Sequence, residues 1–122
     1  MNFPDSLLIC VLKFTSSMGL GYLKSVYEEI FCYEWTKTGI PYKRQHPVPL
    51  IHEEIKMEVG FRADVIIDAK VIVEIKSVEV LAEVHYKQVL TYLKLTEIKL
   101  GLLVNFNVPL IKDGIHRIVN NL

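Results

Sequence analysis

Two acidic residues and a lysine near the middle of the chain have the types and the spacing that phosphate chemistry requires. Asp64 is followed, after nine further residues, by Glu74 and then by Lys76. If the intervening residues form two antiparallel strands with a turn at 68–70, Asp64 lies opposite Glu74. Side chains at i and i+2 of a strand share a face, so Lys76 lies beside Glu74. The spacing therefore predicts two carboxylates and an ammonium group on one face of a hairpin.

Such a group suits the metal-dependent hydrolysis of a phosphodiester. Mg²⁺ prefers oxygen ligands and keeps several waters, so Asp64, Glu74 and the backbone carbonyl of Ile75 are the predicted metal ligands. A bound metal lowers the pKa of its water and neutralises the charge that develops on a phosphate. Lys76 is expected to orient the attacking water or to stabilise the transition state.

The competing interpretation is that these charges form the solvated side of an ordinary hairpin. The residues around them, 71–73 and Ile75, are all apolar. A charge that emerges from a buried strand is costly unless it is paired or bound to a metal. The apolar surroundings therefore favour the catalytic interpretation.

A second polar group follows on the next predicted helix. His85, Gln88 and Tyr92 fall at i, i+3 and i+7, on one helical face. Gln88 and Tyr92 are candidate contacts to a phosphate, to a base or to the waters around the metal. The alternative is that Tyr92 belongs to the core and Gln88 caps a sheet edge. His85 has no partner at ligand spacing and is expected to be structural or exposed.

The pattern of apolar residues predicts one α/β domain over residues 1–122, a mixed β-sheet flanked by helices. Glycines at 19, 21 and 39 separate and end the first two helices. Pro47 and Pro49 interrupt the first strand, which makes it an edge strand. The expected order is α-α-β-β-β-α-β-β, with helices near 5–14, 23–35 and 79–96 and strands at 43–52, 57–67, 71–78, 100–106 and 115–119.

The composition favours a soluble globule but says little about the partner. The 122 residues suit one core, and the formal net charge is zero. Nucleic-acid binding usually leaves a basic excess, although charges can also be segregated by face. No apolar run approaches the about 20 residues that cross a bilayer, and the N-terminus lacks the basic start of a secretory signal. We expect a cytoplasmic protein that does not enter membranes, with Cys10 and Cys32 as buried, reduced thiols.

The segments GFRAD (60–64), VIVEIK (71–76) and HYKQVLTYLKL (85–95) resemble the GxxExxY protein family of the PD-(D/E)XK nuclease superfamily, and GLLVNF (101–106) and KDGI (112–115) resemble the same family. The resemblance covers nearly the whole chain. It implies a restriction-endonuclease-like core and metal-dependent cleavage of nucleic acid. It assigns Asp64 and Glu74 as metal ligands, Lys76 as the catalytic lysine, and Gln88 and Tyr92 as the accessory motif of exonuclease-like branches.

The chain departs from this family at two positions. The family's naming motif aligns with residues 21–27, where Lys24 stands in place of the expected glutamate, and Thr15 stands where histidine is expected. A cation near the site repels Mg²⁺, by an amount on the order of a few kcal/mol where solvation is poor. Glu28, one helical turn later, is a candidate partner of Lys24 or a partial substitute for the missing carboxylate. Lys24 is also a candidate contact to phosphate.

Three hypotheses follow from the sequence. The first is a nuclease that depends on Mg²⁺ or Mn²⁺ and cleaves DNA or RNA, with a homodimer as a compatible state. The second is a nuclease-fold module that has lost catalysis and binds nucleic acid or a protein, which Lys24 and the neutral charge favour. The third is an assembly subunit that buries Phe31, Tyr33 and Trp35, or the edge strand 115–119, against a partner copy.

Overall fold

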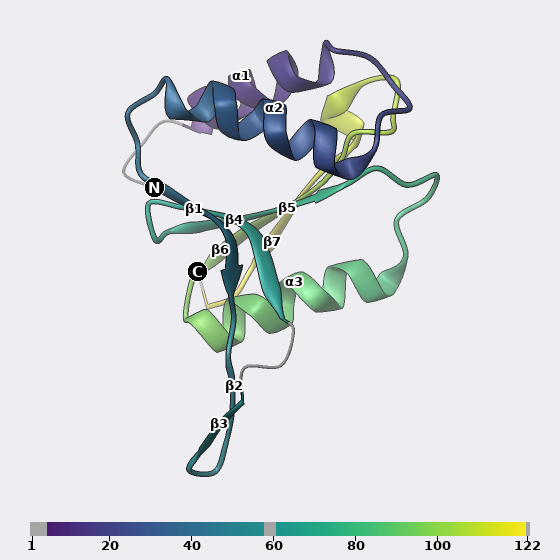
Figure 1. Ribbon diagram of the computed structural model, residues 1–122. Helices are drawn as coiled ribbons and strands as arrows, with labels where there is room; N and C mark the ends of the chain where they lie inside the picture. Colours follow the sequence, from purple (N-terminus) through teal and green to yellow (C-terminus); the bar gives the residue numbers. More distant parts are fainter. Residues whose placement is uncertain (1–4, 58–60, 122) are drawn as a thin grey trace.

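The computed structural model describes residues 5–57 and 61–121, and Figure 1 shows their helices and strands. In chain order the elements are α1 (Asp5–Ser16), α2 (Lys24–Thr36), β1 (Tyr42–Pro47), β2 (Leu50–His52), β3 (Ile55–Met57), β4 (Arg62–Ile67), β5 (Val71–Lys76), α3 (Glu83–Thr96), β6 (Leu100–Asn105), the short 3₁₀ helix η1 (Ile111–Asp113) and β7 (Ile115–Val119).

A five-stranded mixed sheet forms the middle layer, with the strand order β1-β4-β5-β6-β7. Only the β5–β6 pair is parallel, and α3 connects these two strands. Helices α1 and α2 cover one face of the sheet and α3 covers the other, while the β2–β3 hairpin extends away from the body (Figure 1). The prediction of a mixed sheet flanked by helices is confirmed.

The central hairpin, β4 and β5, has the predicted register. Ile67 pairs with Val71 and Val65 pairs with Val73. Asp68 and Ala69 both have a positive φ, of 52° and 54°, and so let the chain reverse within three residues. The same register carries on toward Asp64 and Glu74, beyond the paired residues.

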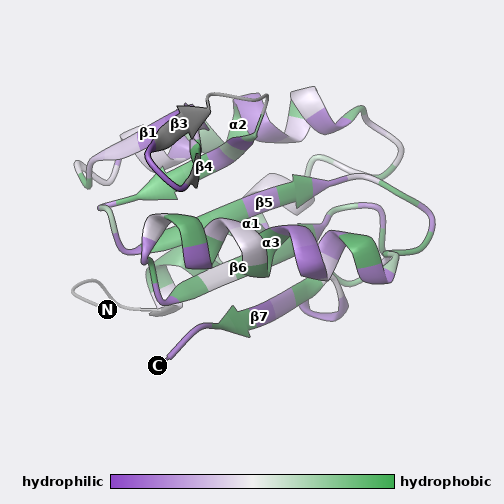
Figure 2. Ribbon diagram, turned by 90° about the horizontal axis from the view of Figure 1, so that it is seen from below, coloured by the Kyte–Doolittle hydropathy of each residue, from purple (hydrophilic) through white to green (hydrophobic). Residues whose placement is uncertain are grey.

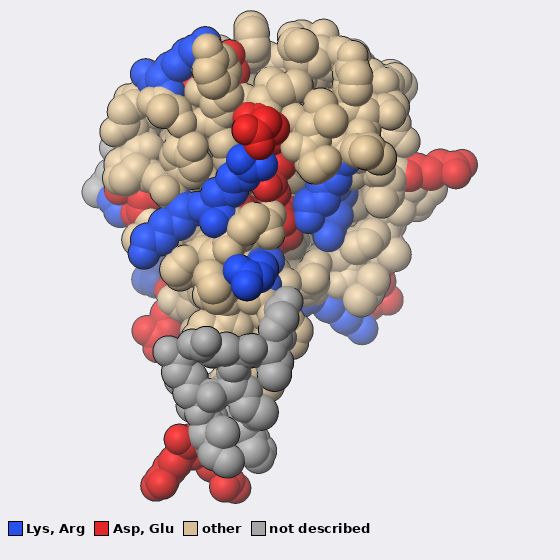
Figure 3. Space-filling view, in the orientation of Figure 1, with Lys and Arg blue, Asp and Glu red and all other residues tan. Residues whose placement is uncertain are grey.

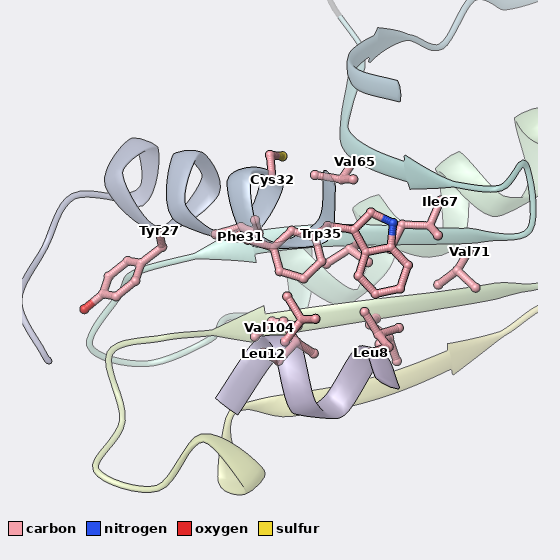
Figure 4. Packing of buried hydrophobic residues seen from close by; sticks show 14 of the residues in the cluster. Leu8, Leu12, Tyr27, Phe31, Cys32, Trp35, Val65, Ile67, Val71 and Val104 are labelled. Carbon is pink, nitrogen blue, oxygen red and sulfur yellow. The ribbon is translucent and has the colours of Figure 1, made fainter. Parts of the chain in front are cut away.

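Helices on both faces divide the core into two clusters. On the α1–α2 side, Leu8 and Leu12 meet Trp35 and Val104, as Figure 4 shows. On the other side α3 lies along β5 and β6, whose residues are mostly hydrophobic (Figure 2). Because both faces are covered, β6 is buried along its whole length.

One predicted strand is wrong in its extent, since it is divided. The predicted strand 43–52 separates into β1 and β2, because Pro47 and Pro49 have no N–H to donate and the Val48 N–H turns to the Phe61 carbonyl. The first part is an edge strand, as expected. The predicted strand 57–67 contains β4 and begins at the last residue of β3, and its residues 58–60 lie outside the described part of the chain.

Further corrections concern a loop and the aromatic residues. Strand β5 ends at Lys76 rather than at 78, because the Asn105 side chain takes both the N–H and the C=O of Val78. The following helix begins at Glu83 rather than at 79. Phe31 and Trp35 are fully buried in the core, so these two aromatics do not face a partner copy. Tyr33 is exposed, as is Cys10, contrary to the expectation for that thiol, whereas Cys32 is buried.

Candidate active site

The predicted acidic pair lies where the backbone ladder between β4 and β5 gives way to side-chain bonds. The Ile75 N–H donates to Asp64 Oδ2 at 2.8 Å, and the Asp64 N–H donates to Glu74 Oε1 at 2.9 Å. Each carboxylate therefore holds the opposite strand by its backbone. Asp64 and Glu74 are both only 2% exposed. The register of the hairpin thus brings the two acids together inside the protein.

Burial and mutual repulsion change how this pair holds protons. Burial, and after it the nearby negative charge of Asp64, raise the pKa of Glu74 to about 8, although Lys76 acts in the opposite direction. Two carboxylates in one poorly solvated site resist being charged together. A cation at the site relieves that repulsion.

The cation that contacts Asp64 is the ammonium group of Lys24, the first residue of α2. Its Nζ lies 2.8 Å from Asp64 Oδ1. Burial by itself lowers the pKa of Lys24, but the hydrogen bond and the charge of Asp64 outweigh that effect, so the pKa is raised. Lys24, which stands where the resemblance of residues 21–27 leads one to expect a glutamate, therefore lies directly at the candidate site.

Gln45 also contacts Asp64, and the sequence did not indicate it. Its Nε2 donates to Asp64 Oδ1 at 3.2 Å and to Glu28 Oε1 at 2.8 Å. Arg44 Nε donates to the other oxygen of Glu28 at 2.8 Å. Glu28 is therefore engaged by Arg44 and Gln45 and makes no ion pair with Lys24. Gln45 contacts the carboxylates of Asp64 and Glu28, and its own backbone has a φ of 50°, a conformation that no local sequence pattern indicates.

Lys76, Gln88 and Tyr92 form a chain of polar side chains on the α3 side of the acids. The Lys76 ammonium lies 3.5 Å from Gln88 Oε1, and Gln88 Nε2 donates to the Tyr92 hydroxyl at 3.1 Å. Tyr92 is buried, which raises its pKa, and the charge of Glu74 raises it further. The alternative that Tyr92 belongs to the core is confirmed, and its hydroxyl contacts Gln88; its contact to a phosphate, a base or the metal's waters stays a prediction.

The other candidates lie outside this group. His85 accepts a hydrogen bond from the Ala82 N–H through Nδ1 at 3.0 Å, and so caps the start of α3. Thr15 is buried and donates to the Val11 carbonyl at 2.8 Å within α1. Both residues have a structural role of their own.

The donor set fits a divalent metal of the magnesium type. One or two carboxylates with a backbone carbonyl are sufficient for such an ion, and Asp64, Glu74 and the carbonyl of Ile75 are the predicted ligands. Burial and the charge of Asp64 raise the pKa of Glu74, so a further positive charge at the pair would favour its ionised form. No group of three or more His, Cys, Asp or Glu side chains able to hold a metal exists among residues 5–57 and 61–121. A metal would therefore depend on the two acids.

Charged side chains gather in the middle of one face of the molecule. Figure 3 shows Lys and Arg side chains on both sides of Asp and Glu side chains on that face. A groove of about 520 Å³ runs along β1, lined by Tyr42, Ile66 and Leu95 among others, and none of the predicted site residues lines it. In the described part of the chain no helix is long and apolar enough to cross a membrane.

Comparison with known proteins yields one match. The family model described as PD-(D/E)XK nuclease superfamily matches residues 3–118. No curated protein matches the chain, and no solved structure matches it. The matched span includes both acids, Lys76, Gln88 and Tyr92.

Proposed function

The chain belongs to the PD-(D/E)XK nuclease superfamily, and from this premise we propose that it hydrolyses phosphodiester bonds in nucleic acid with the help of Mg²⁺ or Mn²⁺. The observation that carries the proposal is the convergence of Asp64 and Glu74, each bonded to the other's strand. Within the superfamily we assign the chain to the GxxExxY family, on the segments 60–64, 71–76 and 85–95.

Each residue of the site has a distinct part in this proposal. Asp64, Glu74 and the carbonyl of Ile75 would hold the metal, which when bound stabilises charge on the phosphate and makes its water more acidic. Lys76 directs its ammonium group toward the phosphate oxygens, where negative charge grows as water attacks phosphorus and the P–O bond to the leaving group breaks. Gln88 accepts a hydrogen bond from Lys76 and so limits where that ammonium can go.

Tyr92 acts through Gln88 rather than on the substrate. Its hydroxyl accepts from the Gln88 amide, which directs the amide oxygen to Lys76. The ring of Tyr92 is held by the core on the α3 side and packs edge-on against Phe61 at 6.2 Å between centroids. A rigid support of this kind keeps a flexible lysine in place.

The test is cleavage of labelled single- and double-stranded DNA and RNA by the purified chain, with Mg²⁺ or Mn²⁺ and with EDTA as the blank. We expect loss of full-length substrate that stops in D64N and E74Q, with a rate at least about 100-fold lower, because one metal ligand is gone. K99A, at the opposite end of the sheet, serves as the control. Unchanged cleavage by D64N would assign the activity to a contaminant.

A second function is favoured by the 2.8 Å contact between Lys24 and Asp64. If that ion pair is permanent, the domain binds nucleic acid or a protein without cleaving it. Binding of an oligonucleotide that D64N leaves unaltered, with no cleavage in any metal, would support this second function. The free thiols of Cys10 and Cys32 suit either function in the cytoplasm, where thiols stay reduced.

A further inference from the structure

Lys24 lies at a position where its charge does not help its own helix. It is the first residue of α2, and a cation at a helix N-terminus opposes the helix dipole. Leu23 offers no side-chain cap, and the first turn holds no acidic residue. The local sequence therefore gives no reason for a lysine here. The partner of its ammonium group comes from 40 residues further along the chain, at Asp64.

The ammonium group covers the outer side of the acidic pair. Asp64 has Oδ2 bonded to the Ile75 N–H and Oδ1 bonded to Lys24 and Gln45. The carboxylate side chain is 3% exposed, whereas the side chain of Lys24 is 42% exposed and reaches solvent. An ion that arrives from solution meets the lysine before it meets Asp64 Oδ1.

The alternative partners of Lys24 are already engaged. Glu28, one turn along α2, accepts from Arg44 and Gln45, both at 2.8 Å. Glu29, the next residue, pairs with Arg44 at 2.7 Å. Arg44 thus pairs with both acids on this side of α2, and Lys24 pairs with Asp64 instead.

We propose that Lys24 is a displaceable internal counter-ion, which occupies the Asp64 oxygen until a divalent metal replaces it. This inference rests on the proposed metal-dependent function and adds its regulation. The site then has two states. In the closed state the ammonium group satisfies Asp64, and in the open state the side chain swings into solvent along its four flexible carbons. Because the ion must break an existing ion pair, the native chain binds metal more weakly than the two acids alone allow.

The first experiment measures Mn²⁺ binding by calorimetry for the native chain, K24M and K37M at one pH and one salt concentration. K37M is the matched control, because it removes the same charge from the other end of α2, where Lys37 pairs with Glu34. We expect the Kd of K24M to fall at least about 10-fold and that of K37M to stay within about twofold of the native value. Equal affinities in the native chain and K24M overturn the inference, and so does an equal gain in K37M.

The second experiment follows the ammonium group itself. A ¹⁵N-labelled sample should show a slowly exchanging Lys24 Nζ signal at low temperature without metal, since that group is hydrogen-bonded and half-buried. K24M identifies the signal. Saturating Mg²⁺ is expected to remove it by returning the group to solvent. A signal that persists unchanged at saturation overturns the inference. If K24M does not fold, K24Q replaces it in both experiments.

The outcomes separate this inference from the proposed function. If K24M binds Mn²⁺ more tightly but neither it nor the native chain cleaves any of the four substrates, the counter-ion inference holds and the nuclease proposal fails. If the native chain cleaves nucleic acid and K24M binds Mn²⁺ no better, the nuclease proposal holds and the counter-ion inference fails.

Discussion

Asp64 shows how one carboxylate can be both structural and chemical. Its Oδ2 accepts the Ile75 N–H, which closes the hairpin where the ladder ends, and its Oδ1 accepts from Lys24 and Gln45. The bond to the Ile75 N–H uses Oδ2, and Oδ1 is left for the side chains of Lys24 and Gln45. Substitution of Asp64 is therefore expected to affect folding as well as the proposed activity, and D64N, which keeps the shape of the side chain, is a better probe than D64A.

The raised pKa of Glu74 predicts a pH dependence of stability in the absence of metal. The folded chain holds the Glu74 proton up to about pH 8, whereas the unfolded chain releases it near the ordinary value of 4.5. Between these values the folded state binds more protons, so the free energy of unfolding falls as the pH rises. We expect the native chain to lose about 2–4 kcal/mol more than E74Q between pH 4.5 and 8.

Urea unfolding of both proteins at pH 5, 6.5 and 8 in EDTA measures this difference. E74Q is the control, because its neutral amide has the same shape and does not titrate, while every other group of the chain is retained. Parallel curves for the two proteins would show that Glu74 titrates near its ordinary pKa in the folded state.

At the scale of elements, the close approach of α3 to β6 supports the site. Gly101 on β6 faces α3, and a methyl group added there would come within 2.7 Å of Val89 Cγ1. Helix α3 also carries Gln88, the neighbour of Val89, and Gln88 contacts Lys76 on β5. A shift of α3 away from the sheet would therefore also move Gln88 away from Lys76. A side chain at position 101 would thus push against α3 and would also disturb the contact between Gln88 and Lys76.

G101A is expected to destabilise the protein by about 1–3 kcal/mol, because Val89 is fully buried and its branched side chain has little freedom to move. The measurement is urea unfolding at pH 7. In a V89A background the same substitution should cost less, since the space is then available. An equal cost in both backgrounds would mean that the clash with Val89 is not the cause.

At the scale of the whole molecule, charge is distributed by face rather than by excess. Lysine plus arginine equals aspartate plus glutamate, with 14 of each, yet several Lys and Arg side chains gather on one face (Figure 3). Arg62 is exposed at the start of β4, two residues before Asp64, and donates to the Gln45 carbonyl at 3.2 Å. A neutral chain can therefore still present cations beside its site.

R62A is predicted to weaken oligonucleotide binding several-fold and to reduce the slope of log affinity against log salt by about 1. K99A removes the same charge from the other end of the sheet and should leave both quantities nearly unchanged. Fluorescence anisotropy from about 50 to 200 mM salt, with EDTA present to prevent cleavage, gives both values. Identical effects of R62A and K99A would show that binding responds to net charge and not to this face.

The sequence determined the acids, their register and the order of helices around a mixed sheet, because strand alternation and turn residues act over a few neighbouring positions. It also identified Lys24 as a residue that differs from the motif that residues 21–27 resemble. Only the tertiary structure decided what Lys24 and Gln45 contact. Lys24 meets an acid 40 residues away, and Gln45 reaches Asp64 from a left-handed backbone on a neighbouring strand. Such contacts depend on how whole elements pack, and no local pattern of residues encodes that packing.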